Sequence, residues 1–304
     1  MFNGTSPFVE GVDNTFLFII VISLILLISL TFLMIYFIVR YRKDKHPEAA
    51  QIEGSTTLEI VWTVIPGILV ILMFWFGWKS YVPMREVPAD AMKVTSVARM
   101  WGFTFNYENG KSSPKLVVPV NKPVRVQLEA VDVLHAFYIP AFRVKNDMVP
   151  GNNDQWVWFT ANKTGSYDLF CAEYCGTLHS AMITKVEVLT EEEFTAWYEG
   201  TELSGEQNAG LTVLQNNACI ACHSLDGAPG VGPSFKGILG RETRVLVDGK
   251  EQTLVADEEY LIRSILKPDS EVVSGYPKGI MQTYEGRLSD QDLQNIVDYL
   301  KTLK

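Results

Sequence analysis

The chain has 304 residues, of which 47% are hydrophobic and 20% charged, and its mean hydropathy is +0.09. This length allows two or three domains, and the composition excludes a disordered or collagen-like chain. The net charge of −9 comes from residues 191–304, which hold 19 acidic and 10 basic side chains, whereas residues 1–190 hold 16 of each. Because an acidic domain repels nucleic acid, nucleic acid is not an expected partner.

Two uncharged apolar runs near the N-terminus predict membrane-spanning helices over about 14–39 and 58–80. The first run has 26 residues without a charge, and a helix needs about 20 apolar residues to cross a bilayer core. No Lys or Arg precedes it and no small-residue cleavage pattern follows, which argues against a signal peptide. The loop between the runs holds Arg40, Arg42, Lys43 and Lys45. By the positive-inside rule this loop is cytoplasmic, and residues 1–92 form a hairpin in membrane lipid that leaves the remaining chain outside.

Residues 93–198 are predicted to form a β-sandwich or small barrel. Val124, Val126 and Leu128 alternate with polar residues, and the Asn162–Gly165 segment has the composition of a turn. Short alternating strands separated by turns are typical of these two folds.

A soft set of metal ligands lies near the end of this domain. Cys171, Cys175, His179 and Met182 fall within twelve residues, and His135 lies upstream. Thiolate and thioether sulfur favour copper, while imidazole suits copper or zinc. A mononuclear blue-copper site uses one Cys, so a second Cys on the same loop indicates two thiolates that join two metals. We therefore expect a binuclear copper centre; the alternatives are a disulfide between the two Cys or a structural zinc site.

Residues 1–190 resemble subunit II of a haem-copper cytochrome oxidase, which has two transmembrane helices and a cupredoxin domain with a binuclear CuA centre. The family motif, C-x-E-x-C-x-x-x-H-x-x-M with an upstream His, is matched at Cys171, Glu173, Cys175, His179, Met182 and His135. The resemblance implies that Glu173 ligates copper through its main-chain carbonyl. It also implies that the Glu173 carboxylate faces a Mg²⁺ or Mn²⁺ site shared with subunit I.

Two weaker positions follow from the same resemblance. Trp101 matches the leading Trp of the aromatic stretch through which electrons reach CuA, although Gly102 and Phe103 replace some of the aromatics that follow. The alternative for these aromatics is packing in the domain core. Glu59 matches a residue at the mouth of a proton pathway in subunit I. The pattern Thr56-x-x-Glu59 is also typical of a helix capping box, and both roles are compatible.

A haem attachment motif follows a polar linker that we expect at 199–210. Cys219-Ile220-Ala221-Cys222-His223 is a C-x-x-C-H sequence, in which the two thiols add to haem vinyl groups and the His ligates iron. A thioredoxin-like redox motif is the alternative, but it needs a βαβ context and does not explain the His. Met281 is the only Met in residues 183–304, and no His follows His223. Met281 is therefore the expected sixth ligand.

Residues 211–304 are predicted to form an all-α domain around this haem. One helix begins at Asp257 and ends before Pro268, and a last helix is capped by Ser289. The domain resembles a class I cytochrome c. That resemblance implies that the Pro233 carbonyl holds the proximal His223 in orientation.

The whole chain thus resembles subunit II of a caa3-type oxidase, a multidomain membrane protein. The resemblance implies that electrons pass from a cytochrome c or a quinol-oxidising complex through haem c and CuA to subunit I, which reduces O₂ and pumps protons. It implies a bacterial inner-membrane location, with other oxidase subunits as partners and both redox domains on the periplasmic face. The alternative is a membrane-tethered copper and haem relay or assembly protein outside an oxidase. A nitrous-oxide reductase, which also uses CuA, would need a His-rich catalytic domain that this sequence lacks.

Overall fold

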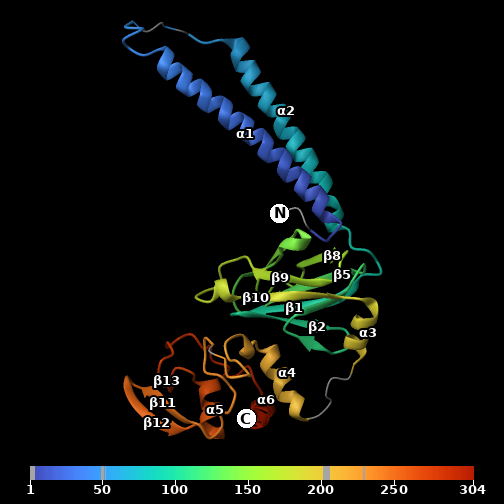
Figure 1. Ribbon diagram of the computed structural model, residues 1–304, viewed down its shortest axis with the longest axis vertical. Coiled ribbons are helices and arrows are strands. Elements are labelled where there is room, and N and C mark those ends of the chain that lie inside the picture. The colour runs from blue at the N-terminus through green and yellow to red at the C-terminus, as the bar shows by residue number, and fades with distance from the viewer. Residues whose placement is uncertain (1–3, 49–50, 52, 201–205, 229) are drawn as a thin grey trace.

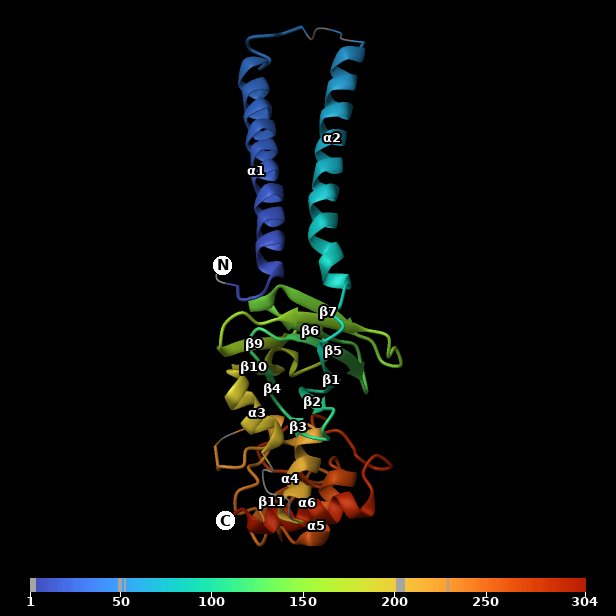
Figure 2. The ribbon, with the colours of Figure 1, turned by 90° about the vertical axis from the view of Figure 1, so that its right-hand side faces the viewer.

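The computed structural model describes residues 4–48, 51, 53–200, 206–228 and 230–304. Three parts follow one another along the long axis: a helical hairpin, a β-sandwich and a mainly helical C-terminal domain (Figures 1 and 2). The loop of the hairpin lies at the end farthest from the sandwich. The fold class predicted from the sequence is confirmed.

The hairpin consists of α1 (Phe8–Arg40) and α2 (Thr56–Tyr81), which extend a few residues beyond the predicted spans. Both helices are apolar on all sides, and the most hydrophobic stretch of each has no buried residue. Such helices are suited to lipid rather than to a soluble core. The predicted capping box between Thr56 and Glu59 does not form, because the N-cap is Ser55 and the residue three positions on is Leu58. Ser55 has extended backbone angles and accepts a hydrogen bond from the Leu58 amide, whereas Thr56 is already helical.

The base of α1 is fixed to the sandwich by a charged pair and an aromatic contact. Arg143 donates to both carboxylate oxygens of Asp13, at 2.7 and 3.0 Å, and this side-on geometry sets orientation as well as distance. The ring of Phe8 meets Trp158 edge-on with centroids 4.8 Å apart. The membrane hairpin and the sandwich therefore have a defined junction.

The sandwich has two five-stranded sheets, in the orders β3-β2-β1-β5-β8 and β4-β10-β9-β6-β7. Pairing is antiparallel except for β1 with β5 and β4 with β10. The strands are β1 (Met92–Arg99), β2 (Gly102–Tyr107), β3 (Ser112–Ser113), β4 (Leu116–Pro119), β5 (Pro123–Ala130), β6 (His135–Ile139), β7 (Val144–Met148), β8 (Trp156–Thr160), β9 (Gly165–Cys171) and β10 (Ile183–Leu189).

The core lies between these sheets, as the predicted alternation requires. Val124, Val126 and Leu128 on β5 have no exposed surface, because side chains two residues apart point to the same face of a strand. A short helix, α3 (Glu191–Glu199), begins with a capping box at Thr190 and covers one edge.

The C-terminal domain is built on α4 (Glu206–Asn216), α5 (Glu258–Leu266) and α6 (Asp290–Thr302). Side chains of Asp257 and Ser289 cap α5 and α6 as expected. The expected linker at 199–210 needs a correction: 201–205 lie outside the described residues, but 206–210 begin α4. Gly210 is explained by packing rather than by a linker: α4 crosses α6 so closely there that a Cβ would lie 2.0 Å from the Asn295 carbonyl oxygen.

The C-terminal domain also carries a three-stranded sheet, which the helical prediction did not contain. Its order is β12-β11-β13, with bounds of Glu242–Val247 for β11, Lys250–Val255 for β12 and Val272–Val273 for β13. Asp248-Gly249 joins β11 to β12, with φ of 50° and 78°. An Asp-Gly pair between two short runs that contain β-branched residues is a strong hairpin signal, so the sequence did contain this element.

Candidate functional site

The two cysteines of the sandwich lie side by side without a bond. Cys171 ends β9 and Cys175 follows in the β9–β10 loop, with Sγ atoms 3.7 Å apart. A disulfide requires about 2.05 Å, so both thiols are free here. Metal–thiolate bonds are about 2.3 Å long, and one metal atom can therefore contact both sulfurs. The spacing of the two free thiols therefore suits a shared metal.

Each sulfur has its own histidine. His135 Nδ1, at the start of β6, lies 3.8 Å from Cys171 Sγ, and His179 Nδ1 lies 3.6 Å from Cys175 Sγ. Met182 Sδ is 3.8 Å from Cys175 Sγ. Ligand atoms of His135, Cys171 and Cys175 all fall within 4.8 Å of one another.

Glu173 completes the group through its main chain. Its carbonyl oxygen is 3.2 Å from Cys171 Sγ, whereas Met182 lies on the Cys175 side. The six residues of the predicted copper motif are thus brought together, with one imidazole and one weak donor beside each thiol. The assignment of one histidine to each of two metals stays a prediction.

Asp132 orients the first of these histidines, a role that the sequence reasoning missed. Its Oδ1 lies 2.8 Å from His135 Nε2, and its other oxygen accepts from the Met100 amide at 2.7 Å. A carboxylate only accepts, so Nε2 carries a proton and Nδ1 is the nitrogen that faces Cys171. The signal was present as an Asp three residues before the His.

The two thiols differ in acidity. Burial acts to raise the pKa of Cys171, but hydrogen bonds from His135 and the Ala136 amide lower it to about 6. Burial and the adjacent Cys171 raise the pKa of Cys175 to about 12. Burial acts to lower the pKa of His135, but Asp132 and Cys171 raise it. In the metal-free chain, Cys171 is therefore the thiol that ionises first.

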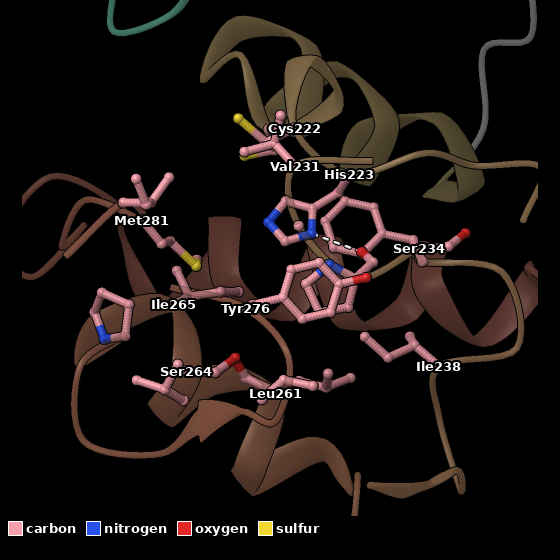
Figure 3. A pocket seen from close by; sticks show the side chains of 18 of the residues that line it. Cys222, His223, Val231, Ser234, Ile238, Leu261, Ser264, Ile265, Tyr276 and Met281 are labelled. Carbon is pink, nitrogen blue, oxygen red and sulfur yellow. Dashed lines mark hydrogen bonds between the residues drawn. The ribbon is translucent and has the colours of Figure 1, made fainter. Parts of the chain in front are cut away.

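The C-terminal domain contains a cavity of about 670 Å³ at the C-x-x-C-H motif. Cys219, Cys222 and His223 lie on its wall, and Met281 comes from the loop before α6. In Figure 3 the His223 ring and the Met281 side chain face the same space from different segments. Burial raises the pKa of Cys219 to about 11, which keeps this thiol neutral. The wall is mostly apolar and suits a large, flat, apolar group.

His223 is held in one orientation. Its Nδ1 donates to the Pro233 carbonyl at 2.7 Å (dashed in Figure 3), and its ring stacks on Phe235 with centroids 4.6 Å apart. Since a carbonyl cannot donate, Nε2 keeps its lone pair. Burial lowers the pKa of His223 although the Pro233 bond opposes this, so the ring is neutral at pH 7. These are the properties of an imidazole that ligates iron.

Trp101 lies between the two groups. It lines the C-terminal cavity, and its Nε1 donates to the Cys175 carbonyl at 3.1 Å. Phe103 is 4% exposed and packs in the sandwich core, as the alternative for these aromatics proposed. Glu59 is elsewhere: it lies exposed in the first turn of α2, at the loop end of the hairpin (Figure 1).

Comparison with known proteins agrees with this three-part structure. The profile of the family "Cytochrome C oxidase subunit II, transmembrane domain" matches residues 1–79, and that of its "periplasmic domain" matches residues 75–189. The profile of the family "Cytochrome c" matches residues 207–304. Cytochrome c oxidase subunit 2 of Alkalihalophilus pseudofirmus is 32% identical, over 96% of this chain and 86% of that protein. The chain belongs to the cytochrome c oxidase subunit II family.

Other members of this family are similarly distant. Cytochrome c oxidase subunit 2 of Cereibacter sphaeroides is 31% identical over 60% of this chain and 73% of that protein. The crystal structure of the periplasmic domain of subunit II of cytochrome oxidase from Bradyrhizobium japonicum is 35% identical. It covers 38% of this chain and 95% of its own, with a TM-score of 0.36.

Membership in the subunit II family confirms the predicted function. The chain is the subunit through which electrons enter a haem-copper terminal oxidase, and it carries its own cytochrome c domain. Its two outer domains imply copper and haem c as cofactors, and its membership implies association with other oxidase subunits. It is membrane-bound through its hairpin, with the β-domain of periplasmic type.

Proposed function

We propose that the sandwich cluster holds a binuclear copper centre and the C-terminal cavity a covalent haem c. The copper residues are His135, Cys171, Glu173 (carbonyl), Cys175, His179 and Met182, and the haem residues are Cys219, Cys222, His223 and Met281. Bound there, copper and haem iron each take up and release one electron at a time, which supplies the relay to the O₂-reducing subunit.

The chain's own groups prepare both sites in the same way. Asp132 and the Pro233 carbonyl each accept one imidazole proton, so His135 presents Nδ1 and His223 presents Nε2. Fixing the tautomer in this way raises the basicity of a ligand and removes its rotational freedom. The low pKa of Cys171 makes one thiolate available near neutral pH, and a metal displaces the proton of Cys175 on binding.

Trp101 is the observation that carries the proposal. One indole lines the haem-sized cavity and hydrogen-bonds to a residue of the copper cluster. Among the described residues, no member of the copper motif itself lines the cavity, so Trp101 provides the contact between the two sites. Trp101 is therefore the proposed point at which electrons cross from one domain to the other.

The remaining roles extend this proposal beyond the chain. Glu173 is half-buried, and its carboxylate would complete a Mg²⁺ or Mn²⁺ site shared with subunit I. Glu59 would sit at the entrance of a proton pathway. The donor would be a cytochrome c or a quinol-oxidising complex. The basic loop, Arg40 to Lys45, lies at the end of the hairpin away from both redox domains, which supports an inner-membrane location with these domains in the periplasm (Figure 1).

The test separates the two centres in the purified oxidase complex. Cys171→Ser should remove the copper signal in electron paramagnetic resonance and leave covalent haem c unchanged. Met281→Leu should keep the haem attached, lower its midpoint potential because a thioether ligand raises it, and leave copper content unchanged. Retention of the full copper signal in Cys171→Ser, or an unchanged haem potential in Met281→Leu, would contradict the assignment of that residue.

A further inference from the structure

The two outer domains meet through one end of the β1–β2 hairpin. Arg99 Nη1 donates to Asn217 Oδ1 at 2.8 Å, and Thr104 Oγ1 donates to the Gln215 carbonyl at 3.1 Å. Gln215 and Asn217 lie where α4 ends, immediately before the haem-attachment turn. Thr104 is only 2% exposed, so this contact excludes water. The hairpin that carries Trp101 is thus seated against the segment that carries Cys219.

Gly102 is a point of close approach between the two domains. A Cβ added there would lie 2.9 Å from Ala218 Cβ and 3.6 Å from Ala221 Cβ. The φ of Gly102 is outside the left-handed range, so its own backbone accepts any L-residue. Ala218 is the reverse case: it has φ 54° and ψ 20°, a left-handed conformation that favours glycine.

The backbone conformation alone would favour alanine at position 102 and glycine at position 218, the reverse of what the sequence has. The glycine is at an ordinary strand position, and the alanine is at the left-handed position. Local conformation explains neither choice, whereas the contact between the two explains the glycine: its missing side chain makes room for the Ala218 methyl group.

We propose that Gly102 and Ala218 are a matched pair of positioning residues that seats the haem-attachment turn against Trp101. A side chain at position 102 pushes the turn away, and the bonds of Arg99 and Thr104 to α4 lengthen with it. The consequence for electron transfer rests on the function proposed above; the docking itself does not.

The experiment is a double-mutant cycle in the full-length chain within its oxidase complex. The variants are Gly102→Ala, Ala218→Gly and the double variant, with Glu108→Ala as control because Glu108 is exposed just beyond β2. Hydrogen exchange is measured by mass spectrometry in segments 99–104 and 213–221. Haem and copper spectra are recorded, followed by the rate of electron transfer between the two centres after photoreduction of the haem.

We expect Gly102→Ala to raise amide exchange in both segments about tenfold, as overpacking at a close contact does, and to slow electron transfer with both spectra unchanged. The double variant should return the exchange rates to within roughly twofold of those of the original chain. Ala218→Gly should therefore slow exchange more in the Gly102→Ala background than it does in the original chain. If Gly102→Ala does not assemble, the double variant should.

Three results would overturn the pairing. These are unchanged exchange in Gly102→Ala, no rescue in the double variant, or failure of both variants to assemble. A loss of the copper or haem signal from the unmodified chain would instead count against the proposed function, and the exchange data would still decide the docking.

Discussion

The copper cluster is enclosed by protein atoms, whereas the haem site is a cavity of about 670 Å³ whose wall comes mostly from the C-terminal domain. Cys171, Cys175 and Met182 are at most 7% exposed and belong to the sandwich core. Among the described residues, that core has 26 buried apolar members, and the core of the C-terminal domain has 8. The sandwich therefore has a complete core without metal, and the C-terminal domain does not have one without haem.

This difference separates two ways of using a cofactor. Copper ligands in a well-packed β-domain are arranged before the metal binds, so the metal adds chemistry to an existing fold. A domain of about 100 residues with a small core is marginal on its own. There the prosthetic group supplies the missing apolar contacts and is part of the core.

The largest effect should therefore follow loss of haem attachment. In Cys219→Ala/Cys222→Ala, residues 206–304 should lose essentially all protection from hydrogen exchange, since about 5–15 kcal/mol of stability is all that a domain of this size has. The sandwich should stay protected. The matched variant Cys171→Ser/Cys175→Ser should lose copper and keep the sandwich folded. Equal protection of the C-terminal domain with and without haem would remove the distinction between the two regions.

A smaller effect is expected from the group behind His135. Asp132→Asn keeps the shape of the side chain but removes the charge that fixes the His135 tautomer. Copper affinity should fall roughly ten- to hundredfold, as for other partners of metal-bound histidines, while the fold stays intact. Competition with a chelator measures the change. Asp147→Asn, which affects only the exposed pair with Lys145, is the control and should leave affinity unchanged.

The two regions also differ in how far the sequence alone predicted them. The C-x-x-C-H motif and the Cys171–Met182 segment each lie within a few residues of chain, so their ligand chemistry can be recognised from the sequence without knowing the fold. The apolar spans are equally local. His135 lies 36 residues from Cys171, so it was assigned to the cluster by its ligand chemistry and by the family motif rather than by spacing.

Contacts between distant segments were not predicted. Gly210 was assigned to a linker because glycine is common in linkers, yet it marks a close crossing of α4 with α6. The bond from Arg99 to Asn217 joins residues 118 positions apart. Neither position has a local signal, because packing against another element determines the residue in both cases.

A third prediction concerns pH in the copper-free protein. The pKa of Cys171 is lowered from 9.0 to about 6, so its thiolate stabilises the fold above pH 9, and this contribution is lost as the pH falls from 9 through 6. Ultraviolet absorbance should show one thiolate titrating near pH 6. Cys171→Ser should abolish that transition, and copper uptake should slow below it because the metal binds the thiolate. A first thiol transition near pH 9 would contradict the assigned environment.

The smallest effect should fall on the contact that joins the two regions. Thr104 Oγ1 donates to the Gln215 carbonyl, one of the last carbonyls of α4, which lack partners within the helix. That carbonyl also accepts from the Ala218 amide, so Thr104→Val removes one of its two bonds and leaves no orphaned acceptor. We expect a loss of about 0.5–1.5 kcal/mol in docking, seen as faster exchange in 213–218 alone. Thr95→Val, at a partly exposed site on neighbouring β1, is the control for loss of a threonine hydroxyl. A change in the copper or haem spectrum of Thr104→Val would contradict a role confined to docking, because it would mean that Thr104 acts on the sites themselves.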